Sequence, residues 1–157
     1  MGESAALLGD ALVVTTVSRT VQVPPETVFE TLADGWLYAL WVVGASHIRG
    51  VDPGWPAVGT RIHHSVGAWP ALVQDNTEVI EAHPPRRLAL TARAWPFGTA
   101  RVVLTLEPAA GGTTIVMEEE PSAGPGRWVH NPVNEKLLHA RNVESLDRLA
   151  SVVEGRR

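Results

Sequence analysis

Six histidines are the side chains of this sequence best suited to proton transfer or metal binding. His63 and His64 are adjacent in a segment with the alternation of a strand, so they point to opposite faces and do not chelate one ion together. If both were helical, His130 and His139 would lie about 180° apart around the helix axis. No HExxH-type spacing occurs and there is no cysteine, so we expect neither a metal site nor thiol chemistry.

Nucleotide-binding and serine-hydrolase signatures are also missing. The fourteen glycines form no GxGxxG, no GxxxxGK(S/T) and no GxSxG motif. Loops of these kinds hold a dinucleotide or a phosphate, or present a nucleophilic serine. We therefore expect no cofactor and set these enzyme classes aside.

His64 and Glu119 are the predicted candidates for proton transfer. His64 shares the inward register of Ile62 along 60–66, and Glu119 continues the register of Met117. Histidine titrates near neutrality, and an apolar hollow raises the pKa of a carboxylate towards the same range. Both groups could then act near pH 7. The alternative gives both residues structural roles, with Glu119 ionised and paired with an arginine.

A buried Glu119 needs a partner, because an unpaired carboxylate would instead take up a proton. Arg19, Arg141 and Asn142 are the candidates, since each falls on or beside the inward register of its predicted element. Asp75 is also placed on the inner face of its strand, although two adjacent β-branched residues leave the phase of that strand open.

The elements that position these groups follow from hydrophobic periodicity and turn residues. Residues 13–23 alternate as a half-buried strand, a first helix follows the double proline, and a short second helix is expected over 36–41. Turns rich in Pro and Gly separate six further segments of strand length, over 47–51, 60–66, 72–82, 87–94, 100–107 and 113–120. Their short connections favour antiparallel neighbours.

A helical period then runs from Val133 to Glu154, with one apolar face formed by Leu138, Asn142, Leu146, Leu149 and Val153. A single helix is narrower than a sheet of seven strands, so the sheet must curl around it and leave a hollow. Inward side chains shrink from leucine to alanine along 87–94, which enlarges that hollow. The residues predicted to line it are Trp41, Ile62, His64, Asp75, Ala92, Ala94, Met117, Glu119, Leu138 and Asn142.

Tryptophan is unusually frequent, with six residues against two Phe and one Tyr. Trp69 and Trp128 fall in loops and are predicted at the mouth of the hollow, where a rigid aromatic ring suits a flat ligand. Loop tryptophans can equally cap the core or form a dimer contact, so a homodimer is a further hypothesis. Trp36 and Trp41 are expected to pack under the sheet edge.

The composition restricts the partners. The 157 residues include 13 basic and 17 acidic side chains, and a net charge of −4 offers no basic surface to nucleic acid. The apolar stretch 5–14 is interrupted by Gly9 and Asp10 and lacks preceding basic residues, so we expect neither a signal peptide nor membrane insertion, and a cytoplasmic location. One domain over 1–157 is expected, with its core over about 13–154.

Several stretches resemble a known family. They are VQVPPETVF at 21–29, Trp41 at the end of the second helix, the GGTT turn at 111–114 and RNVESLDRL at 141–149. Together with the order of elements, they resemble the START-like SRPBCC superfamily, and within it the polyketide cyclase/dehydrase and lipid-transport group. The resemblance implies an α+β helix-grip fold, a seven-stranded antiparallel sheet curled around a long C-terminal helix. It also implies a cavity for hydrophobic molecules.

Three functions therefore stand as hypotheses. The first is binding of a small hydrophobic molecule, such as a lipid, polyketide or aromatic metabolite, in an internal cavity. The second is an aromatase/cyclase-like enzyme, in which His64 and Glu119 move protons on a bound polyketide. The third is a protein-interaction module that uses the outer face of the sheet, although outward residues such as Arg101 and Glu118 indicate a solvated surface.

Overall fold

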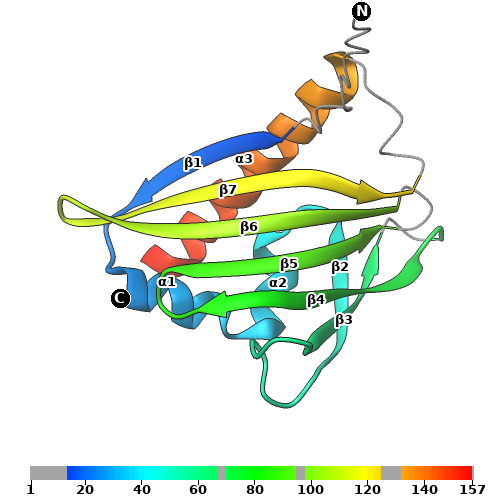
Figure 1. Cartoon of the computed structure of the whole chain (residues 1–157), viewed down its shortest axis with the longest axis horizontal. Helices are drawn as coiled ribbons and strands as arrows, with labels where there is room; N and C mark the ends of the chain where they lie inside the picture. Colours follow the sequence, from blue (N-terminus) through cyan, green and yellow to red (C-terminus); the bar gives the residue numbers. More distant parts are fainter. Residues whose placement is uncertain (1–13, 67–69, 95–97, 125–131, 157) are drawn as a thin grey trace, which may run out of the picture.

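The computed structural model describes residues 14–66, 70–94, 98–124 and 132–156 (Figure 1). One strand, two short helices, six strands and a long helix follow one another, which confirms the predicted order. The bounds are β1 (Thr15–Val21), α1 (Pro25–Leu32), the 3₁₀ helix η1 (Gly35–Leu37), α2 (Tyr38–Trp41), β2 (Ala45–Val51), β3 (Arg61–Val66), β4 (Val73–His83), β5 (Arg87–Ala94), β6 (Gly98–Ala109), β7 (Gly112–Ala123) and α3 (Pro132–Glu154). Within these residues, no helix is long and apolar enough to cross a membrane.

The strands form a seven-stranded antiparallel sheet in the order β1-β7-β6-β5-β4-β3-β2. β2 to β7 pair with their neighbours in the chain, whereas β1 returns to pair with β7. The turn between β6 and β7 passes so close to the end of β1 that a Cβ on Gly112 would lie 1.9 Å from the backbone oxygen of Val21. Only glycine fits there, and Gly111 before it has a φ of +73°.

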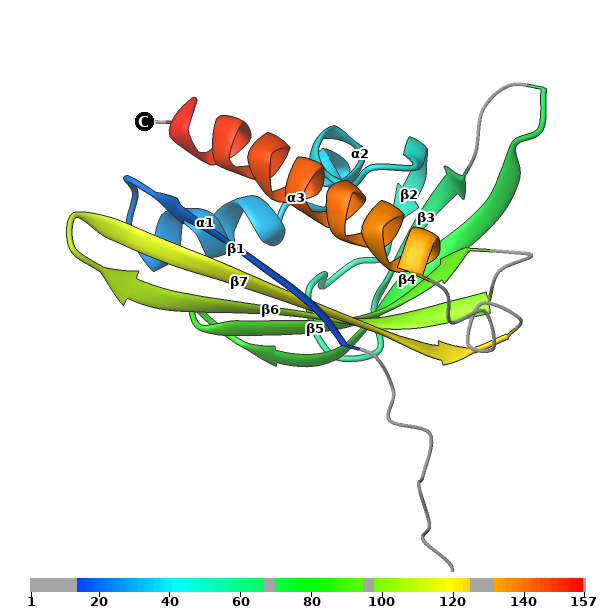
Figure 2. The same ribbon diagram turned by 90° about the horizontal axis from the view of Figure 1, so that it is seen from above.

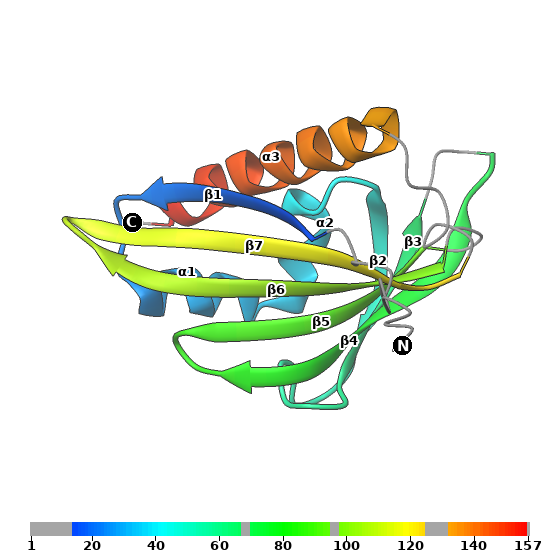
Figure 3. The ribbon, with the colours of Figure 1, turned by 45° about the horizontal axis from the view of Figure 1, so that its top comes forward.

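The three α-helices lie on one face of the sheet, and the sheet curves toward them at its β2–β3 end (Figures 2 and 3). This arrangement confirms the predicted helix-grip fold. On α3, Asn142, Leu146, Leu149 and Val153 are each at most 2% exposed, so the predicted face is the buried one. The three apolar residues of that face join a core cluster with Val28 of α1.

The two tryptophans of the second helical segment differ from each other. Trp41 is buried as expected, but Trp36 is 59% exposed, so the expectation that it packs under the sheet edge is wrong. Gly35 takes the inner position of this tight 3₁₀ turn instead, where an added Cβ would lie 2.8 Å from the Val51 side chain. Trp36 is thereby turned outwards.

The phase of β4, which the sequence left open, is set by a shift in its pairing with β5. The register changes between Val79 and Glu81, where the strand is irregular. Val79 is fully buried and Ile80 is 39% exposed, so only one of the two β-branched side chains reaches the core. Thr77 therefore faces the helices, two residues before Val79 on the same side of the strand.

Candidate functional site

A cavity of about 410 Å³ lies between the sheet and the helices α2 and α3. It lies under the middle of α3, which contributes Leu138, Arg141, Asn142 and Ser145. The remaining wall comes from α2 with the turn that follows it, from Ala45 at the start of β2, and from strands β3 to β7. The lining residues are Tyr38, Trp41, Val42, Val43, Gly44, Ala45, His64, Val66, Thr77, Leu90, Ala92, Arg93, Gly98, Thr99, Ala100, Val102, Met117, Glu119, Pro121, Leu138, Arg141, Asn142 and Ser145.

Most of the described residues that we predicted for the cavity are on its wall, namely Trp41, His64, Ala92, Met117, Glu119, Leu138 and Asn142. Ile62 and Asp75 are not. Ile62 is fully buried, and a Cβ added to Gly35 would lie 3.3 Å from its side chain, so it packs against the 3₁₀ turn. Asp75 is half-buried in β4, and its carboxylate accepts a hydrogen bond from the backbone N–H of Asn76. The side chain of Ala94, and the whole of Trp69 and Trp128, lie outside the described residues.

A chain of three buried polar side chains crosses one wall of the cavity. The hydroxyl oxygens of Tyr38 and Thr77 are 3.0 Å apart, and Thr77 Oγ1 is 2.9 Å from His64 Nε2. The rings of Tyr38 and His64 are stacked, with centroids 5.5 Å apart and an interplanar angle of 21°. The chain joins α2, β4 and β3, and it fixes the orientation of the imidazole.

Burial changes the acidity of both ends of this chain. It raises the pKa of Tyr38 to about 12, because the phenolate would lose its hydration, and the charge of Glu119 adds to the rise. Burial also lowers the pKa of His64 below its ordinary value, although the negative charge of Asp75 opposes this. Both groups are therefore uncharged near neutral pH. A neutral imidazole can accept a proton as well as donate a hydrogen bond.

Glu119 is held by Arg141, one of its three predicted partners. Nη2 of Arg141 lies 2.5 Å from Oε1 and 2.6 Å from Oε2 of Glu119. The Glu119 side chain is 9% exposed and that of Arg141 40%, so the pair closes one side of the cavity between β7 and α3. Arg19 pairs instead with Asp147 of α3, in a half-exposed contact. This geometry favours the alternative in which Glu119 is paired with an arginine and has a structural role.

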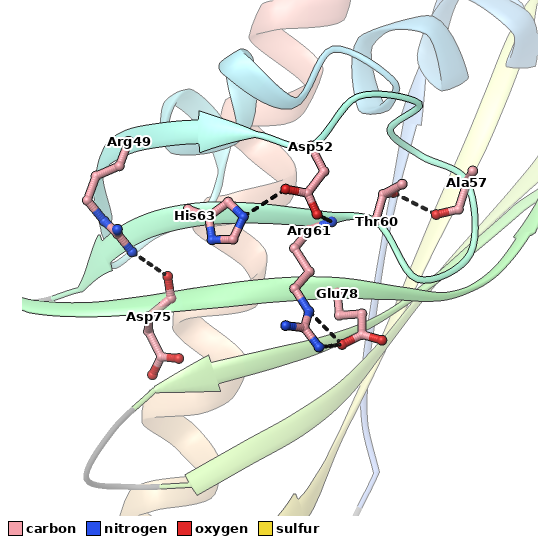
Figure 4. A network of polar contacts seen from close by, with 8 residues as sticks. All are labelled: Arg49, Asp52, Ala57, Thr60, Arg61, His63, Asp75 and Glu78. Carbon is pink, nitrogen blue, oxygen red and sulfur yellow. Dashed lines mark hydrogen bonds and ion pairs between the residues drawn. The ribbon is translucent and has the colours of Figure 1, made fainter.

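His63 points away from the cavity, as the strand alternation predicted (Figure 4). Its Nε2 is 2.9 Å from Oδ1 of Asp52, and the other oxygen of Asp52 accepts a hydrogen bond from the backbone N–H of Arg61. Through the bond with His63, the pKa of Asp52 is lowered. These contacts fasten the two ends of the loop between β2 and β3. Among the residues that the structure describes, no three His, Asp or Glu side chains gather as metal ligands would.

Sequence reasoning missed three buried polar residues of the cavity wall, which are Tyr38, Thr77 and Ser145. Ser145 Oγ accepts a hydrogen bond of 3.1 Å from the backbone N–H of Val43, which ties α3 to the turn after α2. Thr77 lies two residues after Asp75 in the same strand and so shares the inward register predicted for Asp75, but it was given no role. The sequence carries only a weak signal for Tyr38. It is the single tyrosine of the chain, but its segment has bulky side chains on all sides, so no face of the helix stands out.

Solved structures of low sequence identity share this fold. Protein NE0264 from Nitrosomonas europaea has a TM-score of 0.72 at 19% identity, covering 94% of this chain and 97% of that chain. Ara h 8.0201 has a TM-score of 0.70 at 15% identity, covering 92% and 99%. DynU16, described as a protein in the dynemicin biosynthetic locus, has a TM-score of 0.63 at 23% identity, covering 90% of this chain and 47% of that chain.

A sequence family gives a more specific relationship. No curated protein matches the chain. The family described as polyketide cyclase / dehydrase and lipid transport, however, matches residues 13–154, which is nearly the whole chain. This match and the shared fold confirm the resemblance to the START-like SRPBCC superfamily that the sequence motifs suggested. The chain therefore belongs to the polyketide cyclase/dehydrase and lipid transport family.

Proposed function

We propose that this protein binds a small hydrophobic molecule in the cavity between its sheet and α3. The observation that carries the proposal is the cavity itself, whose volume of about 410 Å³ lies within the range of about 300–1,000 Å³ typical of small-molecule pockets. Protein interiors normally pack as densely as organic crystals, and an empty space in the core costs stability. A void of this size is therefore best explained as space kept for a ligand.

The wall supports an apolar ligand of moderate size. Trp41, Leu90, Met117 and Leu138 supply large apolar side chains, while Ala92 on β5 leaves space between them. An aromatic or branched aliphatic molecule would bury most of its surface against these groups, and burial of apolar area is the main source of affinity in such sites.

Uptake of a neutral fluorescent probe, N-phenylnaphthylamine, tests the proposal. The parent protein should bind the probe with enhanced fluorescence. Ala92→Leu fills part of the cavity and should weaken binding about tenfold, equivalent to about 1.4 kcal/mol. Ala57→Leu, in an exposed loop, is the matched control and should bind as the parent does. No uptake by the parent, or equal uptake by Ala92→Leu shown to be folded by circular dichroism, would overturn the proposal.

A second candidate function is an aromatase/cyclase-like reaction on a bound polyketide. The specific observation in its favour is that His64 and Glu119 line the same cavity. His64 could exchange a proton with the ligand, whereas Glu119 is already engaged by Arg141. Incubation with a linear polyketide analogue and chromatography of the products distinguishes the functions. Cyclisation that is lost in His64→Phe, with probe binding retained, would favour the enzyme.

The third hypothesis, an interaction module, has less support. On the outer face of the sheet, Glu81 of β4 contacts both Arg87 and Arg101, at 2.8 Å and 3.8 Å. A surface of this kind is polar and solvated, and lacks the apolar character of most docking patches. The homodimer and the cytoplasmic location also stay predictions.

A further inference from the structure

Two residues of the cavity wall carry buried nitrogen atoms that have no hydrogen-bond partner among the described residues. They are Nδ1 of His64 and Nδ2 of Asn142. His64 is 3% exposed and Asn142 is 2% exposed. A buried polar atom without a partner is unfavourable, and native structures contain few of them. Both residues line the same cavity, so an acceptor on a bound ligand would be placed to satisfy these two nitrogens.

The free atom of Asn142 is a donor. Its amide oxygen lies 3.4 Å from Nη2 of Arg141, and a guanidinium group only donates hydrogen bonds. The oxygen must therefore face Arg141, which fixes the amide orientation without a choice between oxygen and nitrogen. The NH₂ group remains on the side without a partner, and it requires an acceptor.

The free atom of His64 is also a donor. Thr77 has one hydroxyl hydrogen and can donate to only one of its two partners. If it accepted from both Tyr38 and Nε2 of His64, its own hydrogen and Nδ1 would both lack partners. If Tyr38 donates to Thr77 and Thr77 donates to Nε2, the imidazole proton sits on Nδ1 and only that N–H is unmet. The reverse direction leaves both the Tyr38 hydrogen and Nδ1 unmet. The first arrangement is favoured because it leaves one unmet group instead of two.

The charges on the wall do not call for a charged ligand. Glu119 and Arg141 are paired with each other, and Arg93 is exposed. An anionic ligand at this pair would compete with Glu119 for Arg141, and a cationic ligand would compete with Arg141 for Glu119. Either exchange would leave one buried or half-buried charge without its partner, which is costly in an apolar site.

We infer that the ligand is a neutral, largely apolar molecule that carries a carbonyl group. The carbonyl oxygen accepts hydrogen bonds from Asn142 Nδ2 and His64 Nδ1. The inference rests on the proposed function, because it assigns the ligand class of the same cavity. A carbonyl oxygen suits the site, since it accepts hydrogen bonds and brings no donor of its own. A hydroxyl compound would bury an additional hydrogen that finds no acceptor.

Four probes of nearly equal shape test the inference: fluorene, fluorenone, fluorenol and fluorene carboxylate. Calorimetric titration of the parent should give fluorenone an affinity about tenfold higher than fluorene, equivalent to about 1.4 kcal/mol. Fluorenol should be weaker than fluorenone, and the carboxylate weakest. In Asn142→Leu, which removes the donor at similar volume, the ratio of fluorenone to fluorene affinity should fall towards one.

His64→Phe gives an independent test that keeps an aromatic ring against Tyr38, and it should lower the same ratio. His139→Leu, an exposed position on α3, is the control and should leave the ratio unchanged. Equal binding of fluorene and fluorenone by the parent would overturn the inference while leaving the proposed function intact. Tightest binding of fluorenol or the carboxylate would overturn it too. Failure of all four probes to bind would contradict both.

Discussion

Thr77 is the residue on which the buried hydrogen-bond chain depends. It is fully buried, and its hydroxyl bonds to both Tyr38 and His64. Thr77→Val keeps the shape of the side chain but leaves two buried polar groups without a partner. We expect a loss of about 2 kcal/mol or more in the free energy of unfolding, measured by urea denaturation. Thr16→Val, on an exposed position of β1, should change it by less than about 0.5 kcal/mol, and equal effects would contradict the role of the chain.

His64 also gives stability a pH dependence. Its pKa is lowered in the folded protein, whereas an unfolded chain has a histidine pKa of about 6.5. Below that pH the unfolded chain binds the proton more readily than the folded one, so acidification destabilises the fold. The urea midpoint should therefore fall between about pH 7 and pH 5, and the fall should be smaller in His64→Phe.

The pH effect of His64 can be separated from that of Asp52 and from that of an exposed histidine. Asp52 also has a lowered pKa, but its ordinary value is 3.8, so its contribution is lost only at lower pH. His139→Gln, at an exposed position, is the matched histidine variant and should retain the slope of the parent. A slope that is the same in the parent and in His64→Phe would show that burial of this imidazole does not govern stability.

For single residues, the sequence predicted which way a side chain points better than it predicted which residue that side chain contacts. Strand alternation placed His64 inside and His63 outside, because a period of two follows from backbone geometry alone. The bonds to Thr77 join residues 13 and 39 positions apart in the chain. They depend on the angle at which α2 meets the sheet, which no local pattern encodes. Similarly, the choice of Arg141 over Arg19 as the partner of Glu119 depended on how α3 lies across β1 and β7.

The long helix α3 is held to the sheet by one face of its C-terminal half. Leu149 is fully buried in the core cluster, whereas Val143 on the same helix is 40% exposed. Leu149→Ala should cost about 2–5 kcal/mol in the free energy of unfolding, the range found for large-to-small changes in a core. Val143→Ala should cost less than about 1 kcal/mol. Similar costs in chemical denaturation would mean that the face of α3 has been assigned incorrectly.

The elements were predictable because each one has a local signal. Turn glycines and prolines separated the strands, and the 3.6-residue period marked α3. The errors occurred where tertiary contacts determine the position of a side chain. Trp36 was expected inside, but a 3₁₀ turn with Gly35 against Val51 turned it outwards. Ile62 has the predicted inward register, yet it packs beside Gly35 and is not on the cavity wall, because alternation gives the face of a strand and not its neighbours.

The whole molecule has one packed end and one hollow end. The C-terminal half of α3 and α1 share the core cluster, which includes Leu146, Leu149 and Val28. Residues 138–145 of α3 lie over the cavity, and Val133 and Leu137 before them are exposed. The proposed ligand site therefore lies where α3 and the sheet leave space between them. Regions of this kind open locally more easily than the core.

This asymmetry predicts where a bound ligand changes hydrogen exchange. N-phenylnaphthylamine at about a hundredfold above its dissociation constant should stabilise the folded state by about 2.7 kcal/mol. Amides of residues 138–145 should exchange up to about a hundredfold more slowly, because the openings that expose them also break the binding site. Amides of the turn 109–112 open without disturbing the cavity, so their exchange, followed by mass spectrometry, should not change. If the turn slowed as much as the helix, or if 138–145 did not slow at all, the ligand would not be held under the middle of α3.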